Sequence, residues 1–153
     1  MFARKTIIVT LFIMLLTVIS GCGNAASTTI PPTANSGATI APNALAGTTW
    51  NLVSYGAVPT GVAPTAPITL KFGPDNAIAG SSGCNDYAGS ATVDGQNLTI
   101  GPIIATEKAC LDQALNVQEA AFLSGLQAAQ SFAVADTTLT ISYLDGVLIW
   151  RKQ

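Results

Sequence analysis

Histidine is absent from the 153 residues of this chain. Charged residues are scarce at 9%, against about 25% in an average soluble domain. The lack of histidine excludes nucleophilic sites that need a histidine base and metal sites that need histidine ligands. Eight acidic and six basic residues give a net charge of −2, so no nucleic-acid partner is expected, because phosphates require a basic surface. The chain therefore has the composition of one small domain behind a targeting segment.

The first 22 residues have the order of a bacterial lipoprotein signal. Arg4 and Lys5 precede an apolar stretch, residues 6–18, which is shorter than the roughly 20 residues of a membrane-spanning helix. A branched residue and two small residues then lead to Cys22 in the run Ile19-Ser20-Gly21-Cys22. We expect residues 1–21 to be a cleaved signal peptide and Cys22 to carry a diacylglyceryl group and an N-acyl chain such as palmitate. The alternative is an uncleaved signal anchor.

Residues 22–44 predict a lipidated cysteine followed by a flexible stalk. From Gly23 to Ala44 the chain is rich in Ala, Ser, Thr, Asn and Pro and carries no charge. A coil of this length spans roughly 25 Å. It either clears a polymer layer or serves only as a spacer. The expected location is the cell envelope, on the extracytoplasmic side of a bacterial membrane, with the lipid as the membrane contact. Cleavage removes both N-terminal cations, and the four basic and eight acidic residues that remain give a net charge of −4.

Short strands separated by turns are expected over residues 45–153. The run Ile68–Phe72 alternates apolar and polar residues, and Gly73-Pro74-Asp75-Asn76 ends it. Two Asp-Gly pairs, at 94–95 and 145–146, are typical of two-residue hairpin turns. The final hairpin then has an apolar face, while Thr138, Thr140 and Ser142 point toward water. The cross-strand pairs that these turns predict are Ala91 with Leu98, Gly89 with Ile100, Tyr143 with Leu148 and Ile141 with Trp150.

One segment departs from the strand pattern and predicts a helix. Residues 112–129 contain no proline, and Leu115, Phe122, Leu126 and Ala129 recur at helical spacing, with Asp112 as the expected N-cap. An antiparallel sheet of about seven or eight strands with one helix cannot hide both of its faces as a flat layer. We therefore predict a mainly β (α+β) fold in which the sheet closes into a small barrel and the helix covers or plugs one opening.

Cys84 and Cys110 are the two cysteines of the exported domain. An even pair in an oxidising compartment favours a disulfide. Two free thiols are the second interpretation, and redox catalysis or metal binding is the third. Metal is disfavoured because structural zinc takes four ligands. A reactive thiol would have only Lys108 nearby in sequence to lower its pKa.

Four ordered blocks of the domain carry a resemblance to a known family. The blocks are Leu45-Ala46-Gly47-Thr48-Thr49-Trp50-Asn51-Leu52, Gly80-Ser81-Ser82-Gly83-Cys84-Asn85-Asp86-Tyr87-Ala88-Gly89, Thr106-Glu107-Lys108-Ala109-Cys110 and Glu119-Ala120-Ala121-Phe122 with Leu126. They resemble the META domain, the family of the heat-inducible lipoprotein HslJ. The resemblance runs from Leu45 to about Arg151, and one departure is Lys108, where the family more often has methionine. It implies a compact barrel-like fold, an envelope location and an association with stress, and it implies no catalytic mechanism.

The polar residues of these blocks have two interpretations. In the first, glycines and Asn85 shape a sharp turn, and Trp50 and Trp150 anchor the core. In the second, four side chains line a small polar pocket: Asn85, Asp86, Tyr87 and Thr106.

The function expected from the sequence is that of a non-catalytic envelope module without cofactor or metal. It would bind an envelope protein, peptidoglycan or a small apolar ligand, and it would contact the membrane through its lipid. The alternative is a hydrolase that uses carboxylates as acid and base, as glycosidases do. Its candidate residues are Asp86, Glu107 and Glu119, but nothing in the sequence places two of them at a defined separation.

Overall fold

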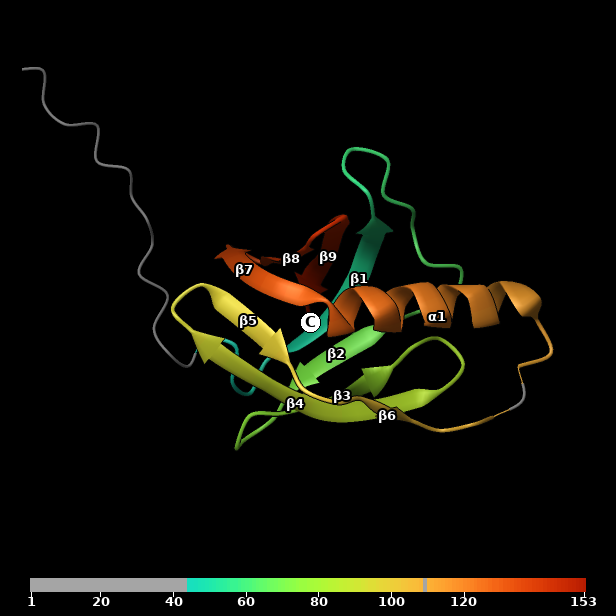
Figure 1. The fold of residues 1–153 in the computed structure, drawn as a ribbon, viewed down its shortest axis with the longest axis horizontal. Helices are drawn as coiled ribbons and strands as arrows, with labels where there is room; N and C mark the ends of the chain where they lie inside the picture. The colour runs from blue at the N-terminus through green and yellow to red at the C-terminus, as the bar shows by residue number, and fades with distance from the viewer. Residues whose placement is uncertain (1–43, 109) are drawn as a thin grey trace, which may run out of the picture. The chain divides into compact units, whose positions relative to one another are not determined.

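The structure is a computed structural model that describes residues 44–108 and 110–153. The predicted signal peptide, Cys22 and the stalk up to residue 43 lie outside these ranges. Nine strands and one helix make up the described part (Figure 1). They are β1 (Thr49–Gly56), β2 (Thr69–Phe72), β3 (Ala77–Ser81), β4 (Asp86–Asp94), β5 (Asn97–Ile100), β6 (Ile104–Ala105), α1 (Gln113–Gln127), β7 (Ala129–Ala135), β8 (Thr138–Tyr143) and β9 (Gly146–Lys152).

Eight of these strands close into an antiparallel barrel, which confirms the predicted fold class. The order across the sheet is β3-β2-β1-β9-β8-β7-β5-β4, and the pairing of β3 with β4 closes it. The short β6 pairs with the start of β4, at Tyr87 and Ala88. Closure matters physically because it removes the free strand edges that an open sheet of this size would expose.

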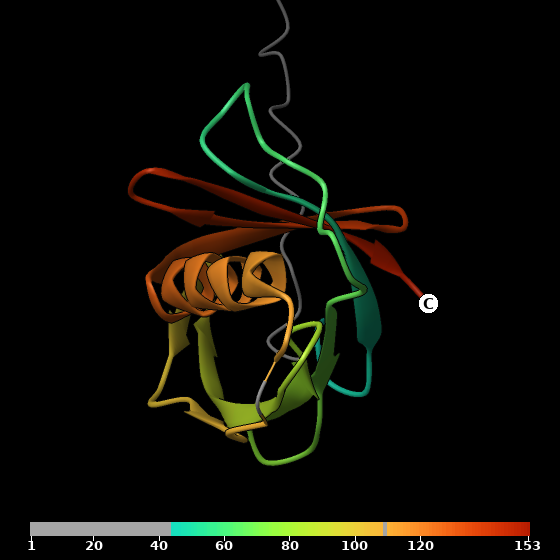
Figure 2. The same ribbon diagram turned by 90° about the vertical axis from the view of Figure 1, so that its right-hand side faces the viewer.

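The barrel interior is filled by apolar side chains and by one face of α1. Figures 1 and 2 show α1 lying between the β8–β9 hairpin on one side and strands β3 and β4 on the other. Phe122 and Leu126 of α1 are fully buried, and the Phe122 ring meets the Trp150 ring edge-on at 5.8 Å between centroids. No helix in the described ranges is long and apolar enough to cross a bilayer. The other large buried apolar residues are Trp50, Leu52, Ile68, Leu70, Phe72, Ile78, Tyr87, Leu98, Ile100, Phe132, Leu139, Ile141 and Leu148.

The predicted helix is confirmed, with a later start and an earlier end. The Asp112 carboxylate accepts a hydrogen bond of 2.8 Å from the backbone N–H of Ala114, which is the expected N-cap contact. The helix ends at Gln127 rather than at 129. Ala129 is the first residue of β7, where it is buried against the barrel.

Both predicted hairpins exist, but each turn lies one residue from its predicted place. The first turn is at 95–96. The residue pairs beside it are Ala91 with Ile100 and Val93 with Leu98, and Gly95 has the positive φ, 60°, that the turn requires. The second is at 144–145, and it pairs Ile141 with Leu148 and Leu139 with Trp150. Each register is therefore shifted by two residues, which leaves the predicted faces unchanged because side chains alternate with a period of two.

Candidate functional site

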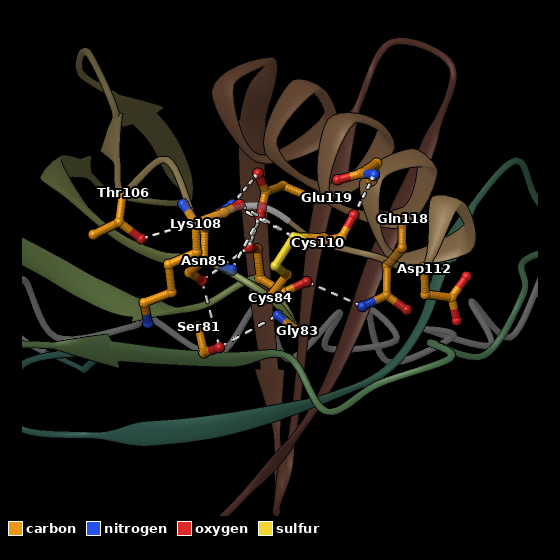
Figure 3. The surroundings of a disulfide bond; sticks show 12 residues. Ser81, Gly83, Cys84, Asn85, Thr106, Lys108, Cys110, Asp112, Gln118 and Glu119 are labelled. Atoms are coloured by element: carbon orange, nitrogen blue, oxygen red, sulfur yellow. Dashed lines mark hydrogen bonds between the residues drawn. A yellow bond between two sulfur atoms is a disulfide. The ribbon is translucent and has the colours of Figure 1, made fainter.

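The polar residues of the glycine-cysteine-asparagine block form one hydrogen-bonded group, which we call the Asn85 cluster. It consists of Ser82, Asn85, Thr106 and Glu119 together with the Cys84–Cys110 disulfide (Figure 3). Three separate segments meet in it: the turn between β3 and β4, the loop that follows β6, and helix α1. The cluster therefore joins the barrel wall to the helix.

The side chain of Asn85 lies at the centre of the cluster. Its Oδ1 accepts from the backbone N–H of Lys108 at 2.7 Å and from the Thr106 hydroxyl at 2.9 Å. Its Nδ2 donates to Glu119 Oε1 at 3.0 Å. Asn85 is 4% exposed, so these bonds replace the water that its amide would otherwise bind.

Glu119 completes the cluster from the first half of α1. Its Oε2 accepts from the backbone N–H of Asn85 at 3.2 Å and from the hydroxyl of Ser82. The Ser82 hydroxyl also bonds to the Asn85 carbonyl at 2.9 Å, and Ser82 has no exposed surface. A serine buried in this way is out of reach of a substrate. The carboxylate of Glu119 holds the turn in place.

The Cys84–Cys110 disulfide is present in the structure. The two α-carbons are 6.2 Å apart, within the usual range of about 4.4–6.8 Å. The bond ties the β3–β4 turn to the segment just before α1, parallel to the Asn85–Glu119 contact. A covalent bond and a hydrogen-bonded network thus close the same junction.

A residue that the sequence analysis did not identify, Gln118, extends this junction. It is 1% exposed, and its amide donates to the Ser82 carbonyl at 3.0 Å and to the Ala66 carbonyl at 3.1 Å. Gly83, with φ 104°, lies so close that a Cβ there would be 2.4 Å from Gln118 Nε2. The spacing of Gln118 four residues before Phe122 was the available signal, because it puts a polar side chain on the buried helix face.

The four residues of the predicted polar pocket have three different locations. Asn85 and Thr106 meet in the cluster, and Asp86 forms an exposed ion pair with Lys108 at 2.8 Å, with side-chain exposures of 62% and 58%. Tyr87 points into the core, where its hydroxyl donates to the Thr69 carbonyl at 2.8 Å and burial raises the pKa of that hydroxyl. A ligand pocket formed by the four residues stays a prediction.

The three carboxylates considered for a hydrolase have separate surroundings. Asp86 is paired with Lys108, Glu119 belongs to the Asn85 cluster, and Glu107 is exposed in the loop after β6. Residues 44–108 and 110–153 contain no group of three or more His, Cys, Asp or Glu side chains that could hold a metal ion.

Two hollows that are lined in part by β2 residues lie away from the Asn85 cluster. One, of about 370 Å³, is at the barrel end beside the β2–β3 turn and is lined by Leu45, Phe72, Asp75, Asn76 and Val93 among others. The other, of about 320 Å³, is on the outer face of β1, β2 and β3, and we call it the Lys71 hollow. Its lining residues are Thr49, Thr69, Lys71, Ala79, Gly80 and Gln153.

The comparisons with known proteins identify the family. The model of the META domain matches residues 43–153. This chain belongs to the META domain family. The META domain of this chain includes all nine strands, α1 and both cysteines of the disulfide. A search of curated proteins found no match.

Solved structures share the fold of this META domain. A protein from Burkholderia xenovorans, solved by NMR, is 27% identical, with a TM-score of 0.62 over 74% of this chain and 89% of that one. A second NMR structure is 21% identical, with a TM-score of 0.58 over 73% and 94%. A crystal structure of a DUF4847 family protein from Bacteroides vulgatus has a TM-score of 0.51 over 70% and 93%, and at 14% identity it shows the fold alone.

Proposed function

We propose that this protein is a lipid-anchored module of the bacterial cell envelope whose META domain has a binding or structural role and no catalytic one. The anchor in this proposal is Cys22, on the extracytoplasmic side of the membrane. The order of basic, apolar and small residues before Cys22 supports it. The family resemblance supports a role under envelope stress.

The observation that carries the non-catalytic part is how the polar side chains are used. Asn85, Glu119 and Ser82 are buried or half-buried polar groups of the Asn85 cluster, and they bond to one another. Active sites keep nucleophiles and acids aimed at a cleft that a substrate can enter. Here the corresponding groups connect α1 to the barrel, which is a structural task.

Complementation of a deletion strain after heat stress tests this function. We expect the wild-type chain to restore survival and Cys22→Ser to fail because the domain is no longer held at the membrane. Asp86→Asn and Glu107→Gln, which keep side-chain shape but remove the acids that a hydrolase would need, should restore survival fully.

Two results would contradict the proposal in different ways. Failure of the folded Asp86→Asn or Glu107→Gln chain would support carboxylate catalysis. Survival of the deletion strain at the wild-type level would refute the stress role.

A further inference from the structure

The positive charges of the domain are concentrated on one side of the barrel. The adjacent strands β3, β2, β1, β9 and β8 contain Lys71, Arg151 and Lys152 and no acidic residue. The fourth cation of the domain, Lys108, lies elsewhere and is paired with Asp86. The domain has a formal charge of −4 after cleavage, but three of its four cations lie on this one wall of the barrel, which has no acidic residue in its strands.

Register places two of these cations on the outer surface of the wall. Lys71 is opposite Thr49 on β1, and Arg151 is opposite Asn51 on the other side of β1. Strand spacing and residue rise put their α-carbons roughly 12 Å apart on a diagonal. Within the described ranges the only ion pair is Lys108–Asp86, so Lys71 and Arg151 have no carboxylate within 4.0 Å.

The Lys71 hollow is on the same surface. The small residues Ala79 and Gly80 leave space beside Lys71, and Thr49 and Thr69 line the same space. An ammonium group is suited to the oxygens of a phosphate group. The acids nearest in the sequence to these strands are Asp75, Asp136 and Asp145, and all three are in turns beyond the strand ends.

The chain that leads back to Cys22 leaves the domain beside this surface. The backbone N–H of Gly47 bonds to the Phe72 carbonyl at 2.8 Å, and that of Phe72 bonds to the Thr48 carbonyl at 2.9 Å. Residues 45–48 therefore run along the end of β2, next to Lys71. The segment between Cys22 and Leu45 is 22 residues long.

We propose that the outer surface of β1, β2 and β9 docks on anionic phospholipid headgroups of the membrane that holds the anchor, with a lipid phosphate in the Lys71 hollow. This rests on the lipid anchoring proposed above. The anchor keeps the surface at a high effective concentration near the headgroups, so a weak electrostatic attraction is sufficient. The acidic residues in the turns and on the opposite wall of the barrel repel the headgroups only weakly, because salt screens charges that are more than about 8–10 Å apart.

Energy transfer from labelled protein to acceptor lipids tests the docking. The acylated full-length chain, purified from membranes, would be placed in vesicles that contain phosphatidylglycerol or phosphatidylcholine alone. A dye on Val53→Cys reports on the outer surface of β1, and a dye on Thr99→Cys reports on β5, on the opposite wall. Acylation and the disulfide occupy the natural cysteines, so each label has one site.

Docking predicts stronger transfer from position 53 than from position 99 in phosphatidylglycerol vesicles and equal transfer in phosphatidylcholine vesicles. Lys71→Gln with Arg151→Gln should lower the ratio of docked to undocked protein roughly 30-fold. The matched control Lys108→Gln removes a cation outside this surface and should leave the ratio unchanged.

Two results would overturn the proposal: equal transfer from both positions in phosphatidylglycerol, or a double variant that docks as Lys108→Gln does. Inorganic phosphate should weaken docking more than chloride of equal ionic strength does, because it competes with the lipid phosphate for the Lys71 hollow. Mass spectrometry of the same preparation separates the two proposals, since an unacylated chain refutes the anchoring and an acylated chain that does not dock refutes only this inference.

Discussion

At the scale of single residues, the buried side chain of Asn85 forms hydrogen bonds with Thr106, Lys108 and Glu119. Asn85→Ala would leave the backbone N–H of Lys108 without its partner and would remove one hydrogen bond each from the Thr106 hydroxyl and the Glu119 carboxylate. A buried group left unsatisfied costs about 1–3 kcal/mol. We expect a loss of about 3 kcal/mol in the free energy of unfolding, measured by urea denaturation. Asp86→Ala is the neighbouring control, and it should cost less than about 1 kcal/mol because its ion pair is exposed.

The two tryptophans offer a matched comparison of buried donors. Trp50 Nε1 donates to the Thr48 hydroxyl at 2.7 Å, whereas Trp150 Nε1 is buried and, in the part of the chain that the structure describes, has no hydrogen-bond partner. Replacement by phenylalanine removes the indole N–H donor at either position, and it removes a similar volume of ring at both. Trp50→Phe should therefore destabilise the domain by about 1 kcal/mol more than Trp150→Phe in the same urea experiment. The opposite order would contradict the assigned contacts.

At the scale of elements, the β8–β9 hairpin tests which face is buried. Ile141 is fully buried, and Thr140 points to the other face of β8. Ile141→Asp puts a carboxylate into the core and should unfold the domain, while Thr140→Asp should cost about 1 kcal/mol or less. Melting curves followed by circular dichroism compare the stability of the two variants. Equal damage at both positions would contradict the assigned faces.

The disulfide should contribute stability through the loop that it closes. The sequence separation of Cys84 and Cys110 is 26, which corresponds to about 3.5 kcal/mol in the chain-entropy model. Reduction should lower the melting temperature by several degrees or more, since a domain of this size shifts about 4–8 °C per kcal/mol. Thiol labelling of the unreduced, unfolded protein from the envelope is the direct check, and two reactive cysteines would contradict the bond.

Sequence patterns predicted the faces of the strands better than the positions of the turns. Gly146 belongs to the strand because it packs against β1, where a Cβ would be 2.3 Å from the Gly56 carbonyl oxygen. A local rule for Asp-Gly turns cannot detect this contact with a distant strand. Strand β7 was not assigned because Ala129 continues the helical spacing of Leu126 and the segment is rich in alanine. Gln118 was missed because its partners, Ala66 and Ser82, are distant in the chain.

At the scale of the whole molecule, the barrel has one weakly paired seam, between β5 and β7. One residue pair, Asn97 with Ser131, is assigned there, and the Phe132 N–H bonds to the Gln96 carbonyl at 2.9 Å. The side chain of Gln127 in α1 adds bonds to the Ile100 and Gly101 carbonyls at 3.1 and 2.9 Å. Helix α1 thus supports the seam as well as filling the interior. The closed barrel was predictable from strand number and patterning, whereas this support depends on contacts that only the folded chain brings together.

We propose that a membrane anchor at Cys22 holds this META domain in the envelope. Mass spectrometry of the N-terminal peptide from the membrane fraction tests it most directly. We expect a peptide that begins at Cys22 and carries acyl chains, and we expect Cys22→Ser to abolish both the acylation and the cleavage after residue 21. A mature chain that begins at another residue, or a Cys22→Ser chain that is processed as before, would contradict the claim.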